Sequence, residues 1–168
     1  FDGTSNDPDA FIAALQKATT ELVHRHPMLH TAVLETGFQK ILPVPDTSPL
    51  QVHDLRTLSK SDVQARLDHL RAQYSHQMLD LSQGEVWKPV LTVLPDGRHR
   101  FHLDVDMAAA DAMSYRRLTE DLAVLTHSAL EQTAPSLAPL PVTYRDYLLR
   151  QQQALSAADS PQAQRVEQ

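Results

Sequence analysis

The sequence contains no cysteine, which excludes disulfide bonds, thiolate nucleophiles and zinc sites built on thiolates. It also lacks any run of basic residues, and its 15 basic and 21 acidic residues give a net charge of −6. Binding to nucleic acid or to an anionic membrane depends on clustered Lys and Arg, so neither partner is expected.

Long apolar segments are missing as well. No segment approaches the roughly 20 apolar residues that cross a bilayer, and the N-terminus lacks the charged and then apolar pattern of a signal segment. With the absence of cysteine, this predicts a soluble, cytoplasmic protein. The 168 residues, without an internal repeat, suit one globular domain. Because the chain begins with Phe1 rather than methionine, we interpret it as part of a larger protein.

The most informative stretch is the D-M-A-A-A-D-A-M-S run from Asp106 to Ser114. Residues 98–106 before it alternate, which predicts a strand with one apolar face of Phe101, Leu103 and Val105 and one polar face of Arg100, His102, Asp104 and Asp106. After it, apolar residues recur every three or four positions, which predicts an amphipathic helix with a stripe of Tyr115, Leu118, Leu122, Leu125 and Ala129. Residues 107–110 form the turn between them.

Further elements precede this stretch. Asp7 and Pro8 predict the start of a helix that ends at His26, before Pro27. His24, Arg25 and His26 then lie in its last turn, where cations favour the negative helix end. Residues 31–34 and 38–44 predict a hairpin, and residues 51–55 a short strand.

A second amphipathic helix is predicted after Ser59, which has Asp62 three residues on as a capping box. Its apolar stripe is Val63, Leu67, Leu70, Tyr74 and Met78, and its solvated face carries Arg66, Asp68, His69 and Arg71. Residues 85–94 predict a strand that turns through Pro95, Asp96 and Gly97 into the motif strand. A proline-rich linker then leads to a helix over residues 142–153, and the chain frays beyond Ser160.

The spacing D-x-x-x-x-D-x-x-S, between an alternating strand and a helix of the form Y-x-x-L-x-x-D-L, resembles the signature of heterocyclization domains in nonribosomal peptide synthetases. These are relatives of condensation domains, whose equivalent stretch reads H-H-x-x-x-D-G. Two further stretches are similar to the same family: Arg25-His26-Pro27-Met28-Leu29 and Tyr144-Arg145-Asp146-Tyr147. The family domain is several hundred residues long, so residues 1–168 resemble its N-terminal lobe.

The resemblance implies an α/β (α+β) fold, the chloramphenicol-acetyltransferase-like lobe, in which helices cover a mixed β-sheet. It also implies an enzyme of natural-product biosynthesis, including siderophores. The parent domain would condense an acyl or peptidyl thioester with a carrier-bound Cys, Ser or Thr, and then cyclise the product to a thiazoline or oxazoline. The partners would be peptidyl carrier proteins, whose phosphopantetheine arms carry the substrates, and the C-terminal lobe; no cofactor would be bound directly.

Three residues are candidates for the site: Asp106, Asp111 and Ser114. Asp106 corresponds to the second His of ordinary condensation domains, and a carboxylate there changes which proton transfers are possible near neutral pH. Asp111 suits either a helix N-cap, accepting from the amide of Met113 or Ser114, or a motif residue held by an ion pair for which Arg100 is a candidate partner. Ser114 lacks a nucleophile-elbow pattern, so we interpret it as structural support.

A metal site is an alternative for His102, Asp104 and Asp106, which share a strand face. Same-face neighbours lie about 6.5 Å apart, too far to hold one ion without another element, so no metal is expected. Instead we expect the polar face to line a water-filled channel. Two other functions stay open: a non-catalytic docking module for carrier proteins, and an ordinary condensation or acyltransferase domain.

Overall fold

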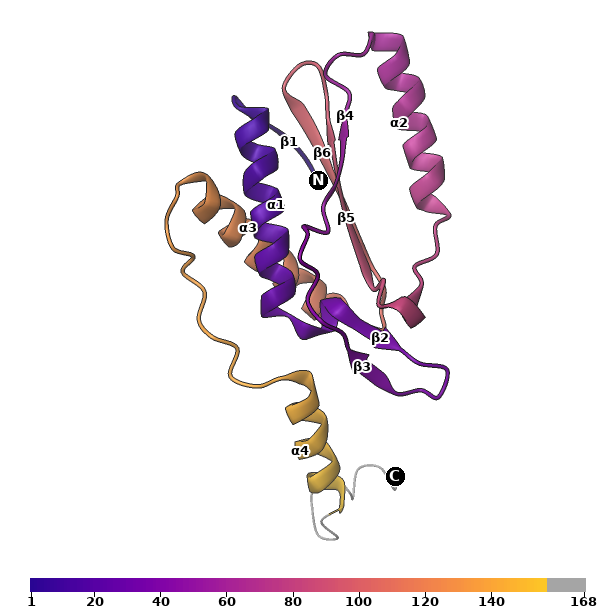
Figure 1. Ribbon diagram of the computed structural model, residues 1–168, viewed down its shortest axis with the longest axis vertical. Coiled ribbons are helices and arrows are strands. Elements are labelled where there is room, and N and C mark those ends of the chain that lie inside the picture. The colour runs from indigo at the N-terminus through magenta and orange to yellow at the C-terminus, as the bar shows by residue number, and fades with distance from the viewer. Residues whose placement is uncertain (157–168) are drawn as a thin grey trace. The chain divides into compact units, whose positions relative to one another are not determined.

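The computed structural model describes residues 1–156. They fall into two compact units, Phe1–Leu137 and a second unit that begins at Ala138. The first unit is built on a four-stranded sheet in the order β1-β6-β5-β4 (Figure 1). Its strands are β1 (Asp2–Thr4), β4 (Gln51–Asp54), β5 (Trp87–Val93) and β6 (Arg98–Val105). Strand β4 is parallel to β5 and the other pairs are antiparallel, so the predicted mixed sheet is confirmed.

The hairpin of β5 and β6 is the centre of this sheet. Trp87 pairs with Val105 at one end and Val93 with His99 at the other. The predicted turn closes it: the amide of Leu94 donates to the carbonyl of Arg98 at 2.8 Å, and Gly97 has a φ of 76°, which favours glycine. The hairpin delivers the end of β6 to the start of the motif turn.

Two helices cover one face of the hairpin: α1 (Pro8–Arg25) and α3 (Ala112–Leu130) (Figure 1). The predicted apolar face of β6 packs here, because Phe101, Leu103 and Val105 contact the main hydrophobic core. That core takes side chains from both helices and from β5, among them Leu15, Leu22, Leu91, Leu118, Leu122 and Leu125. The predicted strand face is therefore confirmed. Of the predicted α3 stripe, Leu118, Leu122 and Leu125 join the core, while Tyr115 and Ala129 are half-buried.

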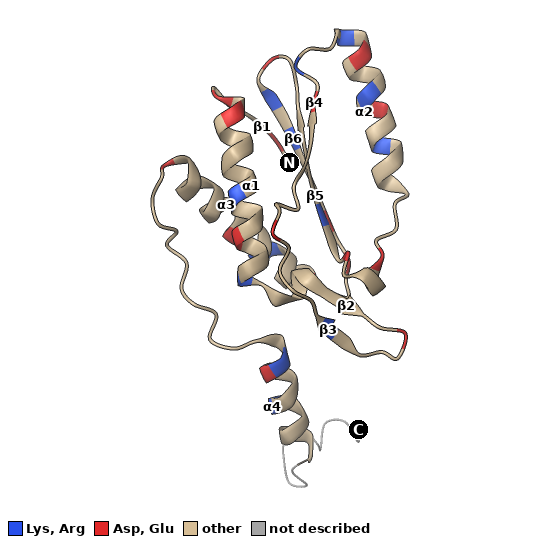
Figure 2. Ribbon diagram, viewed as in Figure 1, with Lys and Arg blue, Asp and Glu red and all other residues tan. Residues whose placement is uncertain are grey.

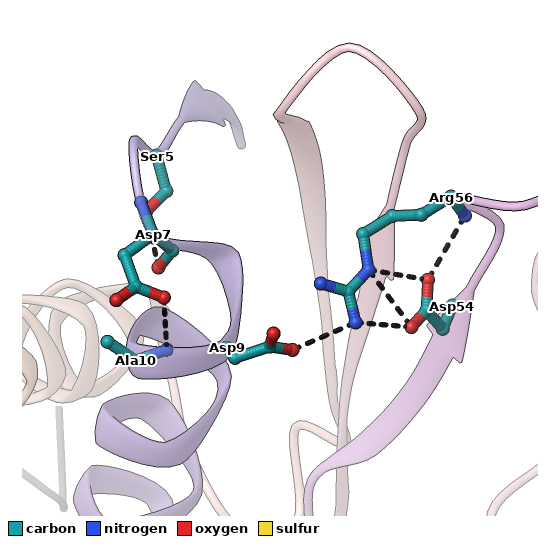
Figure 3. Close-up of polar contacts among 6 residues, drawn as sticks. All are labelled: Ser5, Asp7, Asp9, Ala10, Asp54 and Arg56. Atoms are coloured by element: carbon teal, nitrogen blue, oxygen red, sulfur yellow. Dashed lines mark hydrogen bonds and ion pairs between the residues drawn. The ribbon is translucent and has the colours of Figure 1, made fainter.

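The N-terminus of α1 is held by two side chains (Figure 3). Asp7 is the N-cap, as predicted, and its Oδ1 accepts from the amide of Ala10 at 3.0 Å. Arg56 follows β4 and links two carboxylates: its Nη2 lies 2.8 Å from Asp9 Oδ1 and 2.6 Å from Asp54 Oδ2. The start of α1 is thereby tied to the end of β4.

Helix α2 (Lys60–Ser75) lies at the opposite face of the sheet, and its predicted cap is confirmed, since Ser59 Oγ accepts from the amide of Asp62. Its predicted apolar stripe is confirmed in part: Leu70 is buried, and Val63, Leu67 and Tyr74 are half-buried. Leu70 is the one buried residue of α2, while Met78 lies beyond the helix end and is 94% exposed. Figure 2 shows both basic and acidic residues along α2. The sheet face beneath it carries polar side chains, among them His53, His102 and Asp104, so there is little apolar surface to bury.

The remaining predicted elements of the first unit are also present. Strands β2 (Thr31–Val33) and β3 (Gln39–Ile41) form the predicted hairpin, with Gly37 in its turn at a φ of 81°. Two short 3-10 helices are also present: η1 (Pro27–His30) directly precedes β2, and η2 (Leu81–Gln83) lies between α2 and β5 in the sequence.

The second unit contains α4 (Tyr144–Ser156), which begins two residues later than the predicted helix at residue 142. Thr143 and Asp146 form a reciprocal cap at its start: the amide of Thr143 donates to Asp146 Oδ2, and the amide of Asp146 donates to Thr143 Oγ1. The predicted fraying beyond Ser160 lies outside the described residues. Among residues 1–156, no helix is long and apolar enough to cross a membrane.

Candidate active site

Asp106 shapes the turn that follows β6. Its amide donates to the carbonyl of Val86 at 2.8 Å, which extends the β5–β6 pairing by one residue. Its carbonyl accepts from the amides of Ala109 and Ala110, and its Oδ1 accepts from the amide of Ala108 at 2.8 Å. This is an Asx turn, in which a short carboxylate satisfies backbone amides that no strand or helix pairs. The sequence identified Asp106 but did not predict this role.

Asp111 begins α3 as its N-cap. Its Oδ1 accepts from the amide of Ser114 at 2.8 Å, and its carbonyl accepts from the amide of Tyr115. The hydrogen bonds from the Ser114 amide and hydroxyl lower the pKa of the Asp111 carboxyl, so the cap is ionised near neutral pH. The predicted capping is confirmed, and it suits the positive end of a helix dipole.

The predicted ion pair between Arg100 and Asp111 is wrong. Arg100 binds the carboxylate of Asp2 on β1 through Nε at 2.6 Å and Nη2 at 2.9 Å. Arg100 and Asp2 are paired residues of the β6–β1 ladder, so the register places the two side chains together. In the described part of the chain, no ion pair reaches Asp111 and no hydrogen bond joins Asp106 to Asp111.

Ser114 lies exposed in the first turn of α3. Its amide and hydroxyl donate hydrogen bonds to the Asp111 carboxylate. Across residues 1–156, no hydrogen bond connects Ser114 to a histidine that could act as a base. A serine hydroxyl is a weak nucleophile without such a base. The structure therefore gives Ser114 a supporting position beside the turn.

The polar face of β6 contacts α2 and the residues after it. Gln77 Nε2 donates to Asp104 Oδ2 at 2.9 Å, and the rings of His102 and Tyr74 lie 6.1 Å apart. The Tyr74 hydroxyl is 2.6 Å from His53 Nε2 on β4. Burial and nearby positive charge lower the pKa of both histidines. This half-buried polar layer is the surface that the sequence predicted to line a channel.

The most buried ionic cluster among residues 1–156 was not predicted as a unit. Asp121 of α3 is 1% exposed, and its Oδ2 lies 2.8 Å from Arg25 Nε and 2.9 Å from His26 Nε2. Its Oδ1 lies 3.2 Å from Arg117 Nε. The prediction that Arg25 and His26 interact with the negative end of the helix is therefore incomplete. A signal was present, because Asp121 interrupts the apolar stripe of α3 next to Leu122, and a carboxylate there needs a buried partner.

No group of three His, Cys, Asp or Glu side chains within residues 1–156 converges to hold an ion. His102 and Asp104, two of the three residues considered for a metal, instead contact Tyr74 and Gln77.

Comparison with known proteins agrees with this arrangement. The model of the condensation domain family matches residues 7–165. Phenyloxazoline synthase MbtB of Mycobacterium sp. (strain MCS) is 43% identical over 147 residues, covering 88% of this chain and 11% of that protein. Pyochelin synthetase PchE of Pseudomonas aeruginosa (strain UCBPP-PA14) is 34% identical over 154 residues, covering 90% of this chain and 10% of that protein. The chain thus spans about a tenth of the curated relatives it matches.

A solved structure extends the likeness to the fold. The EpoB cyclization-docking bidomain from Sorangium cellulosum superposes with a TM-score of 0.78 at 28% identity, covering 94% of this chain and 30% of that one. The helix-covered mixed sheet is thus the chloramphenicol-acetyltransferase-like lobe of such domains, which confirms the predicted fold class. Because the family model matches nearly the whole chain and the fold agrees, this chain belongs to the condensation domain family.

Proposed function

We propose that this chain is the N-terminal lobe of a heterocyclization domain in a nonribosomal peptide synthetase. The domain joins an acyl or peptidyl thioester to a carrier-bound Cys, Ser or Thr. The side-chain oxygen or sulfur then attacks the new amide carbon, and loss of water leaves an oxazoline or thiazoline. The likeness to a phenyloxazoline synthase and to a cyclization domain supports this chemistry over plain condensation.

The observation that carries the proposal is the carboxylate at the end of β6. Ordinary condensation domains have a histidine there, and Asp106 stands in its place. Oδ1 of Asp106 is occupied by the amide of Ala108, and no donor within residues 1–156 bonds Oδ2. Oδ2 is therefore free to accept a hydrogen bond from the amine, hydroxyl or thiol of a substrate. A carboxylate held by its own turn can orient that group and take up its proton.

Asp111 and Ser114 have a supporting role in this proposal. The cap holds the first turn of α3 against the motif turn, and the hydrogen bonds from Ser114 keep the pKa of the Asp111 carboxyl low. Substrates arrive on the phosphopantetheine arms of carrier proteins, which are partners and not bound cofactors. The C-terminal lobe supplies the other wall of the site, so this chain alone should form no heterocycle.

The test is Asp106→Asn in the intact domain supplied with loaded carrier proteins. Asparagine keeps an oxygen for the Ala108 amide but removes the charge and the basic oxygen. We expect the melting temperature to stay within about 2 °C, while the loss of water measured by mass spectrometry slows at least tenfold. Asp104→Asn is the matched control, because Asp104 lies on the same strand face and is already bonded to Gln77.

The same experiment separates the alternatives. A non-catalytic docking module would bind loaded carriers equally well with Asp or Asn at position 106, and its wild type would form no product. An ordinary condensation domain would release the linear peptide without losing water. Unfolding of Asp106→Asn with full activity per folded molecule would make Asp106 a structural residue and contradict its assignment to the site. Heterocycle formation by residues 1–168 alone, at a rate like that of the intact domain, would contradict the lobe assignment.

A further inference from the structure

The proposed function leaves one family-like motif without a role, the Arg25-His26-Pro27 segment at the end of α1. In the structure this segment meets α3 through a single carboxylate, Asp121. The residues are 96 and 95 positions apart in the sequence, so the contact exists only in the folded chain. Two of the segments that carry the family resemblance are thereby joined directly.

The hydrogen bonds that Arg25 and His26 donate to Asp121 have a defined direction. Burial alone would raise the pKa of Asp121, but the hydrogen bonds from Arg25 and His26 outweigh it and hold the pKa below its usual value. Burial also lowers the pKa of His26 below its ordinary 6.5, so the ring is neutral at pH 7.5. An ionised carboxylate only accepts hydrogen bonds, so His26 Nε2 must carry the proton and donate it. Charge-assisted hydrogen bonds of this kind demand a defined geometry.

The His26 end of the contact is rigid. The His26 amide donates to the carbonyl of Leu22 at 2.9 Å, and its carbonyl accepts from the amide of Leu29 at 2.9 Å. The next residue, Pro27, has a fixed φ. The apolar stripe of α3 lacks such direction, because hydrophobic contact depends on buried area and tolerates small rotations of a helix. Asp121 therefore adds to the packing of α3 on α1 a directional contact that its leucines do not supply.

Helix α3 connects the Asp121 contact to the candidate site. Asp111 lies ten residues before Asp121, about 15 Å along the helix at 1.5 Å per residue. A small rotation at Asp121 moves the capped start of α3 and the turn that connects it to Asp106. We infer that Asp121, held by Arg25 and His26, is a positioning residue that sets the place of the motif turn. Its relevance to catalysis rests on the proposed function, whereas its effect on the turn does not.

A first experiment measures the turn without any activity. Amide hydrogen exchange is followed by NMR on the 168-residue chain at Ala108 and Ser114, whose amides bond Asp106 and Asp111. The main variant combines Arg25→Met, His26→Leu and Asp121→Leu, because apolar side chains of similar volume often replace a buried ion pair without loss of stability. We expect exchange at both amides to accelerate at least tenfold.

Glu120→Gln is the control for this measurement. Glu120 is the sequence neighbour of Asp121 but is exposed, and its ion pairs within residues 1–156 are with Arg116 and Arg117 on its own helix. It should leave both amides within twofold of the wild type. Exchange within twofold in the triple variant as well would overturn the inference. Failure of the triple variant to fold would also overturn it, because the contact would then be a requirement for folding.

A second experiment uses the intact domain with loaded carriers. A displaced turn should lower kcat at least tenfold in the triple variant. KM for the carrier-bound substrate should stay within threefold, because the three substituted side chains are at most 15% exposed. A purely structural contact would instead lower the amount of folded protein and leave kcat per folded molecule unchanged, which would overturn the inference. If the wild-type domain forms no heterocycle, the proposed function fails, and the exchange data alone decide the role of Asp121.

Discussion

The two faces of the β5–β6 hairpin are covered by helices in opposite ways. On one face, α1 and α3 bury leucines against Phe101, Leu103 and Val105, and a buried carboxylate ties the two helices together. On the other face, α2 buries only Leu70 and meets the sheet through polar contacts of Tyr74 and, just beyond the helix, Gln77. The apolar side provides the stability, and the polar side leaves α2 weakly held.

The difference shows what apolar periodicity can and cannot establish. Both α2 and α3 have apolar residues at helical spacing, and both form helices with the predicted caps. Helix α3 fully buries Leu118, Leu122 and Leu125 of its stripe, whereas α2 fully buries only Leu70. The strand face beneath α3 is apolar as well, and this explains the difference. Depth of burial thus depends on two matching surfaces, of which a helix supplies one.

Core truncation should give the largest contrast between the faces. Leu22→Ala on α1 removes a fully buried side chain and should lower the free energy of unfolding by about 3–4 kcal/mol. Leu67→Ala on α2 removes a half-buried side chain and should lower it by less than about 1.5 kcal/mol. Urea unfolding measures both. Equal losses would mean that α2 is as firmly packed as α1, which would break the comparison.

Acid should weaken both faces through their histidines. Burial lowers the folded-state pKa of His26 and His99 on one face and of His53 and His102 on the other, from an ordinary 6.5. As the pH falls through 6.5, the unfolded chain binds protons that the folded chain resists, so stability is lost. We therefore expect the free energy of unfolding to fall from pH 7.5 to 5.5.

Double variants measure how much each face contributes to this pH dependence of the free energy of unfolding. His53→Gln with His102→Gln should remove the part that belongs to the α2 side, and His26→Gln with His99→Gln the part that belongs to the α1 side. Urea unfolding at pH 7.5, 6.5 and 5.5 provides the slopes. Stability that is constant or rises toward pH 5.5 in the wild type would contradict the lowered histidine pKa values.

A smaller effect is expected for the hydrogen bond that holds α2. Tyr74→Phe removes the hydroxyl that lies 2.6 Å from His53 Nε2 and leaves the ring beside His102. The free energy of unfolding should fall by about 0.5–1 kcal/mol. Hydrogen exchange should locate the change in α2 and leave α3 unaffected. Protection lost equally in both helices would show that the two faces unfold together.

The smallest effect concerns the cap that starts α3. Asn caps a helix about as well as Asp, so Asp111→Asn should change the melting temperature little, whereas Asp111→Ala should lower it by about 2–4 °C. Thermal unfolding followed by circular dichroism separates the two variants. If Asp111→Asn is as destabilising as Asp111→Ala, the negative charge matters more than the hydrogen bond to Ser114.

The sequence alone determined the local features of this protein. The caps at Asp7, Ser59 and Asp111, the β5–β6 turn and the apolar face of β6 follow from short-range chemistry, and each was predicted correctly. The candidate residues Asp106, Asp111 and Ser114 were found in the same way, through their spacing at a junction of strand and helix. Such features need only residues that are close in the chain, and their geometry is largely independent of the rest of the fold.

Only the tertiary structure decided which distant residues meet. Arg100 pairs with Asp2 rather than Asp111 because the strand register puts them side by side. Asp121 reaches Arg25 and His26 across 96 and 95 positions because α1 and α3 pack on the same sheet face. Charges attract at any sequence separation, so charge alone predicts no partner. The partner is chosen when apolar burial brings two elements together, and that choice depends on the whole chain.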